Sequence, residues 1–133
     1  GIRPHLPERD GLLNSLLLTE IVATEGKPLA DCVADLQRQF GPLHYRRVDL
    51  HLQPSQKQRA LAHFKRNGLH KVGQWRVVGR EDLDGTKLYL RDAGWVMVRA
   101  SGTEPVLRVY AEAETPALVS RVVGAVEKTV RGL

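Results

Sequence analysis

The sequence predicts an α+β fold: two helices, then a domain of β-α-β-β-β-β-α order with a mostly antiparallel sheet and helices on one face. Three observations predict it. Apolar residues recur at helical spacing over residues 11–40, short segments between residues 43 and 113 alternate apolar and polar residues, and a further amphipathic helical pattern ends the chain. Short turns between the later strands favour antiparallel pairing.

The first two predicted helices lie close to the N-terminus. Residues 11–24, GLLNSLLLTEIVAT, predict a helix that is apolar around much of its circumference, and Gly26 ends it. Pro28 opens a second helix that runs to about Phe40. Because the first helix needs partners on several sides, we expect the sequence to begin within a larger protein. The single cysteine, Cys32, has apolar neighbours and is predicted to be buried.

The remaining elements follow a change from helical spacing to strict alternation. Residues 45–52 alternate and predict a half-buried strand, after which Ser55 and Gln58 form a capping-box pair at the start of a helix that ends near residue 66. Thr115 is the predicted N-cap of the last helix, which ends at about Arg131. Four strands are expected in between, over residues 74–80, 86–91, 94–100 and 106–113.

Composition excludes several classes of protein. With 42% hydrophobic and 26% charged residues, the 133-residue chain is typical of a soluble globular protein. It has neither a long uncharged apolar segment nor a signal peptide, so we expect a cytoplasmic location and no membrane partner. Residues 1–42 hold four Lys and Arg against six Asp and Glu, whereas residues 43–133 hold sixteen against nine. The second region is therefore predicted to bind an anionic partner.

The segment VRASGTEPVLRVY, residues 98–110, joins two predicted strands through a small polar loop. Alternation places Arg99 on the polar side of its strand, and Arg108 lies on the polar side of the next one. Ser101 and Thr103 supply hydroxyl groups, while Gly102 permits close approach of the backbone to a ligand. Two guanidinium groups, two hydroxyls and free N–H groups suit a phosphate dianion.

Two considerations complicate this interpretation. Glu104 would repel a phosphate unless its side chain points away or pairs with an arginine. The same residues are also ordinary turn formers, so residues 101–105 could be a hairpin loop with no ligand. From composition and spacing alone both alternatives stay open.

The segment VRASGTEPVLRVYAEA resembles the C-terminal phosphate-binding loop of the α-D-phosphohexomutases, the phosphoglucomutase and phosphomannomutase family. HLPERDGLLNSLLLTEIVATEGKPL, near the N-terminus, is similar to the end of the third domain of that family. The resemblance is strong at both ends and weak between about residues 43 and 95. It implies a remnant of the third, sugar-binding domain over residues 1–26, a linker helix over 27–42, and the fourth, TATA-binding-protein-like domain over 43–133.

The resemblance also implies a function. Enzymes of this family interconvert hexose 1-phosphate and hexose 6-phosphate through a phosphoserine and a 1,6-bisphosphate, and their fourth domain holds the phosphate that is not reacting. Their motif implies a substrate phosphate site in this chain, with His5 and Arg9 as possible neighbours of the sugar site. The implied phosphate ligands are Arg99, Ser101, Gly102, Thr103 and Arg108. Implied partners are phosphosugars and the remaining domains of the same enzyme.

The chain departs from the family pattern where catalysis occurs. It has no serine loop, no D-x-D-x-D metal loop and no G-E-x-S-G sugar loop, so the magnesium ion and phosphoserine are expected in other domains and this chain alone is predicted to be inactive. EDLDG, residues 81–85, has only two alternate aspartates and is predicted to be a hairpin turn. We predict no metal site, no catalytic residue and no cofactor within these 133 residues.

Two other classes of function remain as alternatives. A basic sheet could bind nucleic acid, although only Trp95, Tyr89 and Tyr110 could stack on bases, so we expect no nucleic-acid partner. A purely structural interaction domain would bind no small ligand at all.

Overall fold

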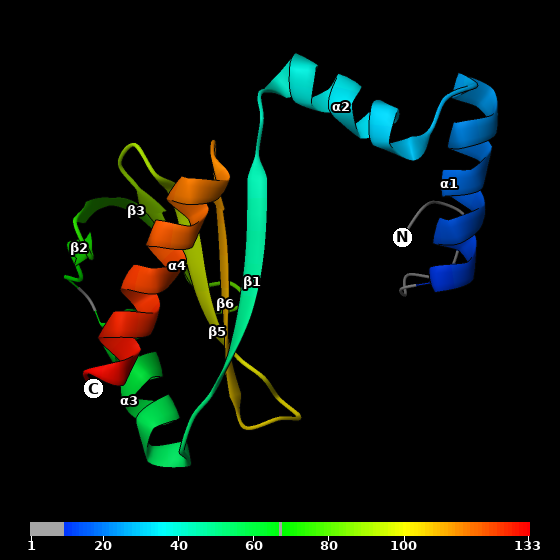
Figure 1. Ribbon diagram of the computed structural model, residues 1–133. Helices are drawn as coiled ribbons and strands as arrows, with labels where there is room; N and C mark the ends of the chain where they lie inside the picture. The colour runs from blue at the N-terminus through cyan, green and yellow to red at the C-terminus, as the bar shows by residue number, and fades with distance from the viewer. Residues whose placement is uncertain (1–9, 67) are drawn as a thin grey trace. The chain divides into compact units, whose positions relative to one another are not determined.

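The computed structural model describes residues 10–66 and 68–133, and the chain divides into two compact units, Gly1–Gly41 and Pro42–Leu133. The first unit contains α1, Gly11–Glu25, and α2, Leu29–Phe40 (Figure 1). The carboxylate of Asp10 accepts a hydrogen bond from the Leu13 amide at 2.9 Å and caps α1. Gly26 ends α1 in the left-handed conformation, with φ of 62°, as the sequence predicts.

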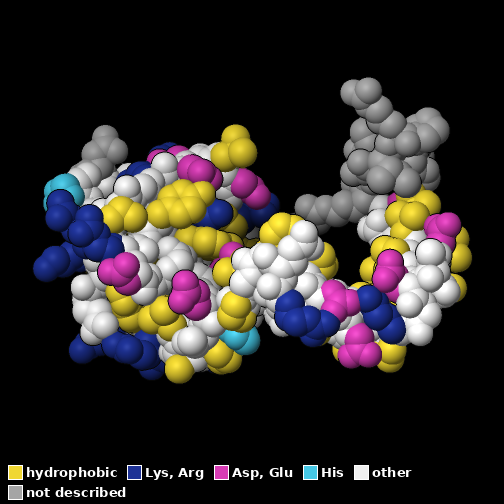
Figure 2. Space-filling view, turned by 90° about the horizontal axis from the view of Figure 1, so that it is seen from above, with side chains coloured by type: hydrophobic (Ala, Val, Ile, Leu, Met, Phe, Trp, Pro, Cys, Tyr) yellow, Lys and Arg dark blue, Asp and Glu magenta, His cyan; other side chains and the backbone are white. Residues whose placement is uncertain are grey.

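Neither helix of the first unit has a buried residue. Leu12 is 73% exposed and Phe40 is 70% exposed, and Figure 2 shows hydrophobic side chains on the surface of this unit. The predicted burial of Cys32 is wrong, because two helices that contact only a small part of each other leave it half-buried. The apolar residues that predicted these helices therefore remain largely uncovered by the described residues.

The second unit confirms the α+β prediction. Its described residues form one antiparallel sheet of six strands in the order β1-β6-β5-β4-β3-β2, together with two helices (Figure 1). The sequence prediction missed β2, which is only two residues long and too short to show alternation. The elements are β1 His44–His51, α3 Pro54–Lys65, β2 Lys71–Val72, β3 Trp75–Glu81, β4 Thr86–Leu90, β5 Gly94–Ala100, β6 Val106–Ala113 and α4 Pro116–Arg131.

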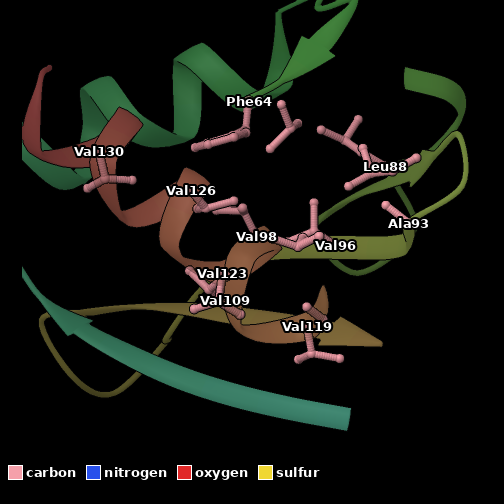
Figure 3. Packing of buried hydrophobic residues seen from close by; sticks show 14 of the residues in the cluster. Phe64, Leu88, Ala93, Val96, Val98, Val109, Val119, Val123, Val126 and Val130 are labelled. Carbon is pink, nitrogen blue, oxygen red and sulfur yellow. The ribbon is translucent and has the colours of Figure 1, made fainter. Parts of the chain in front are cut away.

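The core lies between the sheet and the two helices. Val96 and Val98 of β5 are at most 1% exposed and face Phe64 of α3 and Val126 of α4 (Figure 3). Alternate residues of β6, beginning with Leu107, are buried on the same face. Both helices cover this one face of the sheet. The strand residues that alternate with the buried ones therefore point to the opposite, polar face. This confirms the predicted placement of helices on one side of the sheet.

Of the two N-caps predicted for helices α3 and α4, the first is wrong and the second is confirmed. The capping box predicted at Ser55 is absent, because α3 begins at Pro54, two residues earlier than predicted, and no side chain caps it. Thr115 does cap α4, accepting a hydrogen bond from the Leu118 amide at 3.1 Å. None of the helices in the described part of the chain combines the length and apolar composition needed to cross a membrane.

Candidate functional site

The candidate site lies at the hairpin between β5 and β6. In the antiparallel register Arg99 of β5 is directly opposite Arg108 of β6, and both side chains lie on the polar face of the sheet. On the other side of Arg108, Asp49 of β1 is its cross-strand partner. Like charges in direct opposition destabilise a pair of strands. The hairpin therefore brings two positive charges together, and their mutual repulsion disfavours the pairing of β5 with β6 at this position.

The loop after β5 closes through one backbone hydrogen bond, from the Ser101 amide to the Val106 carbonyl at 3.2 Å. Ser101 is 7% exposed, and its Oγ has no hydrogen-bond partner among the described residues. The Nε of Arg108 is likewise buried without a partner there. A buried donor left unpaired costs about 1–3 kcal/mol. The loop thus holds polar groups that the fold does not use.

Gly102 and Thr103 are exposed at the tip of the loop. A Cβ atom added at Gly102 would meet nothing within 4 Å, and Gly102 does not have a positive φ. Neither packing nor backbone conformation therefore requires a glycine at this position. The amides of Gly102, Thr103 and Glu104 donate no hydrogen bond to another described residue.

Each arginine of the pair contacts one carboxylate. Nη1 of Arg99 lies 2.7 Å from Oδ2 of Asp84, and Nη2 of Arg108 lies 3.1 Å from Oε2 of Glu104. The sequence left open whether Glu104 points away or pairs with an arginine, and the structure gives the second answer. Both carboxylates are more than half exposed, so these ion pairs are weak and can exchange with another anion.

A cavity of about 580 Å³ opens beside the loop. Arg99 and Gly102 line one part of it, and Lys65, from the last turn of α3, lines another. No local sequence pattern places Lys65 in the site, since its proximity to Arg99 depends on the packing of α3 against the sheet. The cavity also contains the carboxylates of Asp82 and Asp84. Its positive groups and its volume suit a small anionic ligand.

The segment EDLDG forms the hairpin turn between β3 and β4, as predicted. Asp82 accepts hydrogen bonds from Nε of Arg80 at 2.5 Å and from the hydroxyl of Thr86 at 3.0 Å. The hydrogen bond from Arg80 is the main reason why the pKa of Asp82 lies below its usual range. Within residues 10–66 and 68–133, no group of three or more His, Cys, Asp or Glu side chains could hold a metal ion.

His5 and Arg9, the weaker candidates for the neighbourhood of a sugar, lie outside the described residues. The five predicted phosphate ligands all lie within them, on one hairpin. Lys57 of α3 contacts the loop although the sequence gave no reason to select it. Its Nζ donates to the carbonyl oxygens of Ser101 and Glu104, at 3.1 and 3.2 Å.

The aromatic residues on the polar face of the sheet are engaged within the fold. Nζ of Lys87 lies 4.3 Å from the ring centre of Trp95 and 5.0 Å from that of Tyr89. The indole N–H of Trp95 donates to Glu112, at 3.0 Å. In the view of Figure 2, Lys and Arg side chains of the second unit are interspersed with Asp and Glu. Trp95 and Tyr89 already have partners within the fold, whereas sheets that bind nucleic acid use aromatic faces that are free to stack on bases.

Comparison with known proteins identifies the family of the chain. Residues 55–129 match the family model described as the C-terminal domain of phosphoglucomutase/phosphomannomutase. The chain is 30% identical over 122 residues to a phosphoglucosamine mutase of Bacillus licheniformis, covering 92% of this chain and 23% of that protein. It is 31% identical over 110 residues to a phosphoglucomutase/phosphomannomutase of Thermococcus kodakarensis, covering 80% and 21%.

A third relative is a phosphoglucosamine/phosphogalactosamine mutase of Sulfurisphaera tokodaii, 30% identical over 129 residues, with 97% of this chain and 26% of that protein covered. The chain thus spans about a quarter of the length of these curated relatives. The family model covers more than half of the chain and includes the whole candidate hairpin. On this evidence the chain belongs to the phosphoglucomutase/phosphomannomutase family and contains its C-terminal domain.

Proposed function

We propose that the β5–β6 hairpin holds a phosphate group of a phosphosugar, as part of an enzyme that interconverts hexose 1-phosphate and hexose 6-phosphate. In the proposed reaction a phosphoserine of the enzyme gives its phosphoryl group to the sugar monophosphate. The 1,6-bisphosphate formed then returns its other phosphoryl group to the serine. This hairpin binds the phosphate that is not being transferred.

One observation carries the proposal: the direct opposition of Arg99 and Arg108 beside a loop with free amide groups. A phosphate dianion placed there would replace the repulsion between the two guanidinium groups with charge-assisted hydrogen bonds. The hydroxyls of Ser101 and Thr103 can donate to its remaining oxygens. Rotation of the Ser101 and Arg108 side chains brings their unpaired donors to the ligand. The hydrogen bonds formed there offset the free-energy cost of leaving these donors buried without a partner.

The arrangement also suits a substrate that binds in two orientations. A bisphosphate must turn over between the two transfer steps, so each end of the sugar occupies the same site in turn. Fixed positive charges that recognise only the phosphate accept both orientations equally well. The hairpin contains no side chain amide that would read the sugar hydroxyls, and its recognition groups are guanidinium, hydroxyl and backbone N–H.

The substrates are proposed to be hexose or hexosamine phosphates, in line with the names of the relatives. Catalysis itself is assigned to parts of the enzyme beyond these 133 residues. The described residues contain no group of three or more His, Cys, Asp or Glu side chains that could hold a metal ion, and the magnesium ion is proposed to bind in other domains of the enzyme. The chain alone is accordingly expected to bind phosphosugars without converting them.

The test is a titration of isotope-labelled chain with glucose 1,6-bisphosphate, followed through backbone amide NMR shifts. The expected result is saturable shifts at Arg99 to Arg108 that are absent with glucose. Shifts spread evenly over the surface, or none at millimolar ligand, would overturn the proposal for this chain. A single-stranded oligonucleotide titrated in parallel tests the nucleic-acid alternative, which the engaged aromatic residues do not favour.

A further inference from the structure

Three carbonyl groups of the 101–105 loop accept hydrogen bonds from one distant segment of the chain. Nζ of Lys57, in the first turns of α3, donates to the carbonyl oxygens of both Ser101 and Glu104. The carbonyl oxygen of Pro105 accepts a longer hydrogen bond, 3.5 Å, from the amide of Leu52. Both donors belong to the segment of β1 and α3, which is about fifty residues away in sequence. The loop therefore depends on a long-range contact for its conformation.

This contact decides where a loop amide points. The carbonyl of Ser101 and the N–H of Gly102 belong to the same peptide group, and in a trans peptide they point in opposite directions. Holding the Ser101 oxygen against Lys57 therefore turns the Gly102 N–H away from the Lys57 ammonium. The second hydrogen bond, to the carbonyl of Glu104, fixes the end of the loop. It orients no N–H group, because the next residue, Pro105, has none.

Lys57 has no carboxylate partner among the described residues, and its side chain is half-buried. A lysine ammonium is a compact charge with three donors, and here two neutral carbonyls of the loop accept from it. Its positive charge consequently lies behind the loop, where no ion pair with another described residue neutralises it. An anion at the tip of the loop is attracted by this charge as well as by the two arginines.

We propose that Lys57 is a positioning residue for the phosphate site: it orients the Gly102 amide toward the ligand and adds an uncompensated charge behind the loop. This inference rests on the proposed function, because it concerns the same phosphate. It differs from the proposed function because it assigns a role to a residue of α3, outside the hairpin. Lys57 and Ser101, which share a hydrogen bond, are 44 residues apart in the sequence.

The experiment compares the 133-residue chain with its Lys57→Met, Lys57→Arg and Lys128→Met variants. Lys128 is exposed near the end of α4 and donates no side-chain hydrogen bond in the described part of the chain, so Lys128→Met removes the same charge without touching the loop. Three quantities are measured: the dissociation constant for glucose 1,6-bisphosphate, the amide order parameters of Gly102 and Thr103 without ligand, and the thermal unfolding midpoint.

Lys57→Met is expected to weaken binding by about fivefold to tenfold and to lower both order parameters before any ligand is added. Lys57→Arg should recover part of the affinity and order, whereas Lys128→Met should change the affinity less than about twofold. Unfolding midpoints within a few degrees of the wild type would show that the loss is local.

Four results would overturn the inference. Equal affinity in Lys57→Met and wild type would remove Lys57 from the site while leaving the proposed function intact. An equal loss in Lys57→Met and Lys128→Met would reduce its role to net charge, and unchanged order parameters would deny that it positions the loop. If the wild type itself shows no saturable binding, the proposed function fails and this inference fails with it.

Discussion

Arg80 and Arg99 lie at the same end of one sheet, yet the fold uses them differently. The guanidinium group of Arg80 is fully engaged: it donates to Asp82, to the carbonyl oxygen of Arg66 at 3.1 Å and to that of Lys65 at 2.7 Å. Arg99 contacts a single exposed carboxylate, that of Asp84. An arginine fixed by several acceptors stabilises the fold, whereas one with a single weak partner is available to a ligand.

The largest expected effect is on stability, in Arg80→Gln. This change removes the hydrogen bonds to the two carbonyls that end α3 and to Asp82, and we expect the free energy of unfolding to fall by about 2 kcal/mol. Urea denaturation measures it, with Arg91→Gln as the matched control, because the Arg91 side chain has no partner in the described residues. A loss of phosphosugar affinity with unchanged stability would reverse the roles assigned to the two arginines.

The next effect is on binding, in Arg99→Gln. Loss of one charged ligand of the phosphate is expected to weaken glucose 1,6-bisphosphate binding at least about tenfold, which is about 1.4 kcal/mol. The free energy of unfolding should change by less than about 0.5 kcal/mol, because the surface pair with Asp84 contributes little. The NMR titration measures the affinity. Wild-type affinity in this variant would contradict the assignment of Arg99, whatever happens to its stability.

A smaller effect of opposite sign is expected in Asp84→Asn. The carboxylate of Asp84 competes with the phosphate for Arg99, so its removal should tighten binding by about twofold to threefold. Asn is well accepted in tight turns, and the turn itself should survive. Asp92→Asn, in the turn at the other end of β4, removes the same charge far from the site and serves as control. Weaker binding in Asp84→Asn would mean that this carboxylate supports the site instead.

The smallest effect is the pH dependence of stability that Asp82 contributes. Its pKa is lowered in the folded protein, mainly by the hydrogen bond from Arg80. The stabilisation is therefore present above the unfolded pKa of about 4 and is lost as the pH falls through the lower folded pKa. Between about pH 5 and pH 2.5 the urea midpoint of the wild type should fall more steeply than that of Asp82→Asn. If the two curves of urea midpoint against pH are parallel, the pair of Asp82 with Arg80 contributes nothing to the free energy of unfolding.

The sequence predicted the elements that depend on local pattern. Thr115 as the cap of α4, the turn at EDLDG and the opposite faces of Arg99 and Val98 all follow from near neighbours in the chain. β2 was missed because two residues cannot show alternation, and the start of α3 was misplaced because Pro54 competes with the Ser55 capping box.

The candidate site was predictable only in part, for a related reason. Its arginines and hydroxyls lie in one continuous segment, so spacing alone brought them together. Lys57 and Lys65 reach the same place from α3, and Arg80 is engaged by carbonyls 14 and 15 residues away. Such contacts depend on how α3 packs on the sheet, and no local pattern encodes them.

The difference between the two arginines can be tested by observing both in one experiment. The Nε–H resonances of Arg80 and Arg99 can be assigned and followed while glucose 1,6-bisphosphate is added to the labelled chain. We expect a saturable downfield shift for Arg99, as its partner changes from Asp84 to phosphate, and no shift for Arg80. Equal shifts of both resonances, or a shift of Arg80 alone, would contradict the division between a structural arginine and a ligand-binding one.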